Sequence, residues 1–212
     1  MICLLCEKEW TPLPTWKELL LLQRPLPICS ACYTQWTPYP KEHINLPCKL
    51  KVYVLYVYDQ PMQRLLYQYK ERQDIALAPI FSNMVTKWLK RRHYDCIVPI
   101  PAHPDNVKSR TFAHIDAILD AANLRYQHVL RKTTSTRMSE KSRKERLSYK
   151  ELFAPIFSHV STDHTYLLVD DVVTTGNTLC QAAEQLRRLG ASSIEALAIS
   201  RPLVRKGGKK DE

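Results

Sequence analysis

Apolar residues in the last part of the chain change from a strand pattern to a helix pattern within a few positions. Residues 166–173 form an apolar run rich in valine and leucine, which is typical of a strand buried on both faces of a parallel sheet. From Asn177 onward, leucine and alanine recur at helical spacing, and Gly190 stands where the helix would end. The pattern predicts a strand, a short turn and a helix between residues 166 and 189.

The middle of the chain shows the same alternation of strands and helices. The predicted strands are 51–58, 95–100, 125–129, 166–173 and 193–199, and the predicted helices begin near Pro61 or span 75–92, 112–123 and 177–189. Successive β-α-β units place their strands in parallel, so we expect an α/β fold with a mainly parallel sheet and helices on both faces. Residues 38–50, which contain three prolines, are interpreted as a linker into this domain.

The predicted turn, residues 174–178, has a composition suited to binding phosphate. It contains three threonines and Gly176, one of only four glycines in the chain. Glycine permits a positive φ or the close approach of a ligand. Backbone N–H groups at the start of a helix attract phosphate together with the helix dipole, and threonine hydroxyls add further donors.

Two carboxylates, Asp170 and Asp171, end the predicted strand just before this turn. They would repel a bare phosphate but suit a ligand that also carries sugar hydroxyls or a bound Mg²⁺. A ribose 5-phosphate has these properties. The alternative is an ordinary strand whose aspartates cap the helix, which leaves the threonines and the placed glycine unexplained.

The segment from Leu167 to Leu179 resembles the phosphoribosyl pyrophosphate (PRPP) motif of type I phosphoribosyltransferases. In that family two acidic residues contact the ribose hydroxyls and the following turn wraps the 5-phosphate. The resemblance implies that Asp170 and Asp171 are the ribose-contacting, catalytic residues. It assigns PRPP binding to Asp170, Asp171, Thr174, Thr175, Gly176, Asn177 and Thr178.

Two C-x-x-C pairs near the start of the chain predict a metal site. They are separated by 22 residues and consist of Cys3, Cys6, Cys29 and Cys32. Two such pairs supply the four thiolates of a tetrahedral zinc site, and a closed Cys₄ set is typical of structural Zn²⁺. The alternative is four reduced cysteines without metal.

The composition describes one full domain with a small appendage. We expect a module and linker at 1–50, a phosphoribosyltransferase-like domain at 51–204 and a charged tail at 205–212. No apolar run reaches membrane-spanning length and no signal peptide is apparent, so we interpret the chain as cytoplasmic. In a reducing compartment, its seven cysteines indicate metal ligands or buried thiols rather than disulfides, and Cys96 and Cys180 are interpreted as buried free thiols.

The net charge of +10 points to a polyanionic partner. Part of the excess lies between Arg131 and Arg146, a segment with many serines and threonines that predicts an exposed loop. Such a loop would contact the phosphates of DNA, and the alternative is a solvated surface without a ligand. The candidate DNA-binding residues are Arg137, Lys141, Arg143, Lys144 and Arg146.

The order of two C-x-x-C knuckles followed by a small PRPP-type domain resembles that of the ComF (ComFC) competence-protein family. Four further segments match that family in place and residue type: 69–74, Ile97–Pro101, Leu130–Thr133 and Arg143–Phe153. The resemblance implies a DNA-uptake protein of natural transformation that handles single-stranded DNA. Its implied partners are the ComFA-type ATPase/helicase of the uptake machinery and a DprA-type single-strand loader.

Segments that would face an acceptor depart from the family pattern. Arg110 and Phe112 are present, but the glycine and the two amides expected beside them are replaced. Three functions stay open: a DNA-uptake protein, an active phosphoribosyltransferase with Mg²⁺, and a regulator that senses PRPP or a nucleotide. For a transferase, the candidates on the pyrophosphate side are Lys108, Arg110, Arg131 and Lys132, and the candidate bases are His103 and His114.

Overall fold

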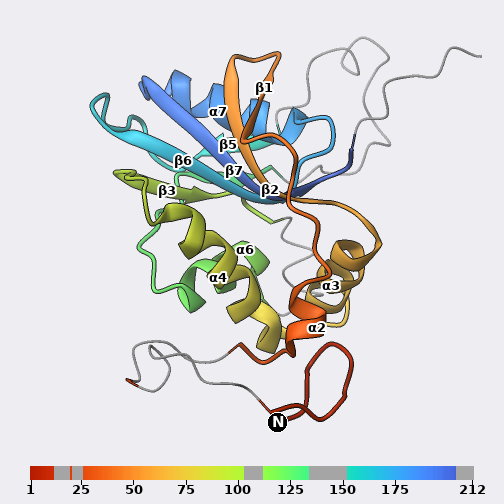
Figure 1. Ribbon diagram of the computed structural model, residues 1–212. Helices are drawn as coiled ribbons and strands as arrows, with labels where there is room; N and C mark the ends of the chain where they lie inside the picture. Colours follow the sequence, from red (N-terminus) through yellow and green to blue (C-terminus); the bar gives the residue numbers. More distant parts are fainter. Residues whose placement is uncertain (12–19, 21–25, 103–111, 134–151, 204–212) are drawn as a thin grey trace, which may run out of the picture.

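The computed structural model describes residues 1–11, 20, 26–102, 112–133 and 152–203 (Figure 1). Its elements are α2 (Ser30–Tyr33), β1 (His43–Leu46), β2 (Leu50–Val57), α3 (Gln60–Lys70), η1 (Ile75–Leu77), α4 (Ala78–Leu89), β3 (Cys96–Pro99), α6 (His114–Ala121), β4 (Leu130–Lys132), β5 (Phe153–Pro155), β6 (Thr165–Val172), α7 (Asn177–Arg188) and β7 (Ser193–Arg201). No helix in these ranges has the length and apolar character needed to cross a lipid bilayer.

A five-stranded sheet forms the centre of the molecule. Its strand order is β1-β2-β7-β6-β3. The β2–β7, β7–β6 and β6–β3 pairs are parallel, whereas β1 joins the edge antiparallel to β2. The predicted α/β class with a mainly parallel sheet is therefore confirmed. In such a sheet the strand ends that carry ligands gather at one edge, which is where β6 leads into α7.

Helices cover both faces of this sheet (Figure 1). Side chains alternate along β6, so Leu167 and Val169 belong to the core under α3, α4 and α6, whereas Leu168 belongs to the core under α7. On β7, the small side chains of Ala196 and Ala198 face α7, which allows the helix to lie close to the sheet. Burying one leucine contributes about 1.5–3 kcal/mol, so this double-faced burial fixes the register of β6.

Two segments differ from the sequence prediction. The expected linker at 38–50 contains β1, and a turn over Pro47 with Lys49 at φ 56° closes a β1–β2 hairpin. The strand predicted at 125–129 is not formed. Extended pairing begins instead at Leu130, where β4 meets β5 in a separate antiparallel ribbon. Short apolar runs do not specify their partners, so the sequence could not show either pairing.

The interpretation of Cys180 as a free thiol was wrong, because the structure joins it to Cys48 in a disulfide across 132 residues. Cys48 lies in the turn of the β1–β2 hairpin, and Cys180 lies in the first turn of α7. The two meet because the hairpin packs against the start of α7, which residue spacing along the chain cannot indicate. Cys96 is a free cysteine, as expected.

Candidate functional site

The phosphate turn, residues 174–178, connects the end of β6 to the start of α7. Thr174, Thr175 and Asn177 are exposed, whereas Gly176 is buried. The backbone N–H of Asn177 donates to the Thr175 hydroxyl oxygen at 3.4 Å. The turn thus places exposed threonines at the N-terminus of an α-helix, an arrangement that attracts an anion.

Gly176 is required by its surroundings as well as by its backbone. Its φ of 82° lies in the left-handed region, which other residues rarely adopt. A Cβ atom here would lie 2.5 Å from Leu46 Cδ1 of the β1–β2 hairpin. The hairpin therefore supports the phosphate turn from behind.

Asp170 and Asp171 are both buried, with 9% and 6% of their surfaces exposed. Strand alternation turns them to opposite faces of the sheet. Asp170 accepts a hydrogen bond from the Asp171 N–H at 2.9 Å, and Asp171 accepts one from the Val172 N–H at 2.7 Å. Burial raises the pKa of Asp170 to about 7, although Lys70 and Lys132 act in the opposite direction.

Asp171 forms an ion pair with Lys70, the last residue of α3. His114, at the start of α6, places Nε2 3.6 Å from the same carboxylate oxygen. The Tyr69 hydroxyl donates to the His114 carbonyl at 2.6 Å and holds α3 against α6. The Asp171 carboxylate therefore faces two potential cations in a largely buried position.

The contact between Lys70 and Asp171 is the feature of this site that sequence analysis missed. The segment 69–74 was noted only for its family resemblance, and the two residues lie far apart along the chain. A lysine at the end of an amphipathic helix gives no sign of the carboxylate it will meet. Of the two candidate bases, His114 lies at the site, whereas His103 falls outside the described residues.

The other predicted basic residues are only partly described. Arg131 and Lys132 lie on β4, where Arg131 is exposed and Lys132 is half-buried. Residues outside the described ranges are Lys108, Arg110, Arg137, Lys141, Arg143, Lys144 and Arg146.

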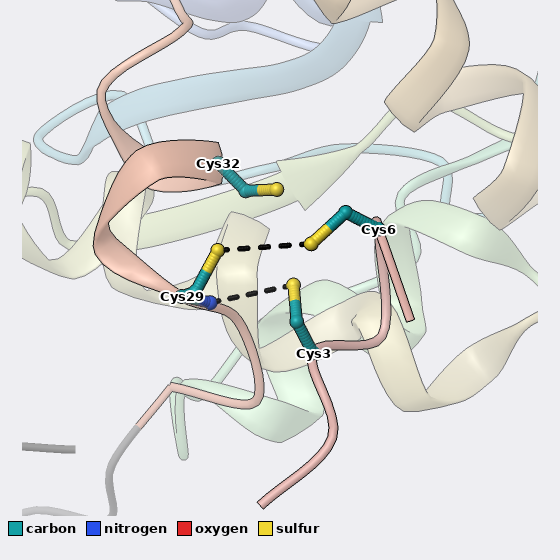
Figure 2. A group of neighbouring side chains, drawn as sticks. All are labelled: Cys3, Cys6, Cys29 and Cys32. Carbon is teal, nitrogen blue, oxygen red and sulfur yellow. Dashed lines mark hydrogen bonds between the residues drawn. The ribbon is translucent and has the colours of Figure 1, made fainter. Parts of the chain in front are cut away.

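The four knuckle cysteines come together as predicted (Figure 2). The sulfur atoms of Cys3, Cys6, Cys29 and Cys32 all lie within 4.8 Å of one another. The Sγ atoms of Cys6 and Cys29 are 3.8 Å apart. Two sulfurs bound at about 2.3 Å to one tetrahedral ion lie about 3.8 Å apart, so this cluster could hold a metal ion.

Backbone hydrogen bonds favour the ionised thiolate form of one cysteine in this cluster. Burial opposes ionisation of Cys3, but hydrogen bonds from the backbone of Cys29, Cys6 and Leu5 lower the pKa of its thiol to about 6. The Cys29 N–H donates to Cys3 Sγ at 3.3 Å. Burial and the neighbouring Cys29 thiol raise the pKa of Cys32. One sulfur of the set is thus readily ionised, and thiolates are the form that binds metal.

Comparison with known proteins identifies a matching domain family and several relatives of the chain. The family described as "Phosphoribosyl transferase domain" matches residues 118–211. A competence protein ComFC of Streptococcus pneumoniae is 31% identical over 69% of this chain and 66% of its own length. The chain thus spans about two thirds of that relative. A competence protein ComFC of Bacillus subtilis is 24% identical over 95% of each chain.

Among solved structures, the chain shows a distant likeness to an adenine phosphoribosyltransferase from Thermoanaerobacter pseudethanolicus. It is 15% identical, its TM-score is 0.40, and the match covers 66% of this chain and 85% of that enzyme.

Proposed function

Because this chain belongs to the ComF (ComFC) competence-protein family, we propose that it serves DNA uptake in natural transformation by binding single-stranded DNA and a phosphoribosyl ligand such as PRPP. The observation that carries the ligand proposal is the phosphate turn. Its exposed hydroxyls and left-handed Gly176 follow directly on Asp170 and Asp171. Its backbone amides and hydroxyls suit the 5-phosphate of the ligand.

The carboxylates have different roles in this proposal. Asp170 carries a raised pKa, so near neutral pH its carboxyl group can donate to as well as accept from a ribose hydroxyl. Asp171 is already paired with Lys70, so it would contact the ribose by giving up part of this ion pair for a hydrogen bond to a ribose hydroxyl. Lys132 on β4, together with Mg²⁺ brought in by PRPP, would balance the charge of the pyrophosphate.

We also propose that the Cys₄ cluster holds structural Zn²⁺. All four sulfur ligands come from the protein, so no position is left for a substrate. Metal analysis should give about one equivalent of zinc per chain, and Cys3→Ser with Cys6→Ser should abolish it. Cys96→Ser provides a matched control, because this free cysteine lies away from the cluster. A folded wild-type protein without metal would contradict the proposal.

Single-stranded DNA is the proposed macromolecular ligand, and the ComFA-type ATPase/helicase and DprA-type loader are the proposed partners. The basic excess of the chain supports this assignment, because neutralising DNA phosphates releases counterions. The residues between Arg131 and Arg146 remain candidates for this contact. Neutralising Arg143, Lys144 and Arg146 together should weaken binding and flatten its dependence on salt.

Phosphoribosyl transfer is the second candidate function, and His114 is the observation that favours it. Its Nε2 atom lies 3.6 Å from the Asp171 carboxylate, so an imidazole able to accept a proton stands beside a predicted ribose-binding residue. In this case PRPP, Mg²⁺ and an acceptor base should yield pyrophosphate. PRPP binding without pyrophosphate release would instead favour a ligand-binding protein or a PRPP-sensing regulator.

The ligand proposal is tested by calorimetry with PRPP and Mg²⁺. Thr174→Val with Thr175→Val removes two exposed hydroxyls without disturbing the core, and affinity should fall at least tenfold, since hydrogen bonds to charged groups contribute about 1.5–3 kcal/mol each. Thr162→Val, at another exposed threonine, should bind as wild type. Equal affinity of all three proteins would refute the assignment of the turn. The same variants, introduced into a strain lacking the gene, test whether transformation needs the site.

A further inference from the structure

A groove lies between the Cys module, residues 1–36, and helix α3. Its volume is about 670 Å³, which is in the range of cavities that hold small organic ligands. α3 contributes a continuous stripe, because Gln60, Gln63, Arg64, Tyr67 and Gln68 follow one another at helical spacing. The opposite side of the groove is formed by Leu5, Cys6, Cys32, Gln35 and Trp36 of the module.

The charges that line this groove have one sign. Arg64 and Arg72 line it, and among the lining residues that the structure describes there is no aspartate or glutamate. Two carboxylates near α3 have partners of their own: Asp59 caps the helix by accepting from the Met62 N–H, and Asp74 accepts from Gln68 in the groove wall. Two exposed arginines without a lining carboxylate favour an anionic occupant.

Aromatic and amide side chains accompany the arginines. Tyr67 lies one helical turn from Arg64 and is 58% exposed, so its ring is open to a ligand. Tyr58, which also lines the groove, is half-buried. Gln35 and Gln60 are exposed at the rim and offer both donors and acceptors. Stacking surfaces and amides beside arginines suit the flat faces and polar edges of unpaired bases.

The groove is built into the fold rather than formed by a loose segment. Gln68 Nε2 donates to the Leu4 carbonyl at 3.1 Å and joins α3 to the module. The opposite face of α3 is fixed in the core by Met62, Leu65, Leu66 and Tyr69. At its end, α3 carries Lys70, the partner of Asp171. A ligand in the groove therefore lies along the same helix that reaches the candidate phosphoribosyl site.

We propose that this groove binds single-stranded nucleic acid, with a base stacked on Tyr67 and phosphates beside Arg64 and Arg72. The inference rests on the proposed function and deepens it, because it assigns single-strand binding to residues other than 131–146. An acidic peptide would also satisfy the arginines. An acidic peptide, however, supplies no base to stack on the Tyr67 ring and no base edges to hydrogen-bond with the glutamine amides.

The test uses the full-length zinc-loaded protein and a fluorescently labelled deoxythymidine oligonucleotide, followed by anisotropy over a series of salt concentrations. Tyr67→Leu keeps an apolar side chain but removes the stacking face, so affinity should fall about tenfold or more. Tyr67→Trp should retain binding. Arg64→Gln with Arg72→Gln should make the slope of log K against log salt shallower by about 1.4, because each lost phosphate contact on a single strand removes about 0.7.

Matched controls are Phe157→Ala, at an exposed aromatic residue outside the groove, and Arg91→Gln, at an exposed arginine. Both should bind as wild type, and thermal melting checks that each variant is folded. Groove variants that bind with wild-type affinity and slope would overturn this inference and leave the proposed function intact. A wild-type protein that binds no single strand would overturn the proposed DNA function. If the groove variants lost binding to an acidic peptide but kept wild-type DNA binding, the groove would be assigned to a protein partner instead.

Discussion

At the scale of single residues, Gly176 links the phosphate turn to the rest of the fold. Its left-handed backbone shapes the turn, and the absence of a side chain leaves room for Leu46 behind it. The exposed threonines can change without loss of packing, whereas Gly176 cannot. The turn is therefore packed against the hairpin at Gly176 and exposed to solvent at its threonines.

Gly176→Ala should destabilise the protein through two separable effects. The left-handed backbone costs about 1–2 kcal/mol for a residue with a Cβ, and the contact with Leu46 adds about 1–3 kcal/mol of overpacking. Urea denaturation should show that Leu46→Ala costs less in the Gly176→Ala background than in wild type. Strictly additive effects would show that the contact is relieved in another way. Gly190→Ala, which is also strained but meets only ordinary contacts, should leave PRPP binding intact.

Asp170 should make stability depend on pH. Its pKa rises from 3.8 to about 7 on folding, so the folded protein retains a proton that the unfolded chain releases. This contribution to stability is complete below about pH 4 and is lost as pH rises towards 7, at roughly 1.4 kcal/mol per pH unit. Asp170→Asn should remove this slope in denaturation curves recorded from pH 4 to 8, whereas Asp163→Asn at an exposed site should keep it. A slope unchanged in Asp170→Asn would contradict the assignment.

At the scale of elements, helix α3 joins three parts of the molecule. Its buried face packs in the core, its exposed stripe lines the groove, and Lys70 at its end pairs with Asp171 of β6. The amphipathic spacing that predicts the helix accounts for the first of these roles. The other two depend on what the fold places beside it.

Lys70→Met should cost about 3–5 kcal/mol of unfolding free energy, because it leaves the Asp171 carboxylate buried without this lysine. Adding Asp171→Asn should recover part of that loss, and a double-mutant cycle measures the coupling. Lys51→Met is the matched control, since the Lys51–Glu195 pair is 39% and 26% exposed and should contribute less than about 1 kcal/mol. Equal costs for the two lysines would show that burial of the Lys70 pair has no energetic role.

At the scale of the whole molecule, the parts meet at contacts between distant segments. The Cys module shares the core of α3 and α4 through Cys3, Cys32 and Trp36. The β1–β2 hairpin is joined to α7 by the Cys48–Cys180 disulfide beside the phosphate turn. A cavity of about 480 Å³ lies there, lined in part by Cys48, Thr175 and Asn177.

A protein without the Cys48–Cys180 disulfide should be less stable than the oxidised wild type. The 132-residue separation of the two cysteines corresponds to a loop-closure contribution of about 4–5 kcal/mol in the chain-entropy description. Guanidinium denaturation of Cys180→Ser and of reduced wild type should show similar losses, and Cys96→Ser should show none from this source. Oxidised wild type no more stable than Cys180→Ser would indicate that the bond does not constrain the unfolded chain.

The candidate site was predictable to the extent that it is local. The phosphate turn and both C-x-x-C pairs could be placed from the sequence because each is short and its chemistry is set by neighbouring residues. The Lys70–Asp171 pair and the Cys48–Cys180 bond could not, because each joins residues from distant segments. The sequence predicts a linker where β1 lies, because an edge strand among prolines has a weak hydrophobic pattern.

Residue patterns along the chain were sufficient to predict the central strands β2, β3, β6 and β7, the mainly parallel sheet, the four converging cysteines and the turn after β6. Hydrophobic periodicity and turn chemistry act over a few residues, so they can be read along the chain. Three further features follow from the folded arrangement alone: Leu46 supports Gly176, Asp171 is paired with Lys70, and α3 and the Cys module enclose a groove. These features depend on packing between segments brought together by burial of apolar surface, which selects neighbours by shape rather than by position in the sequence.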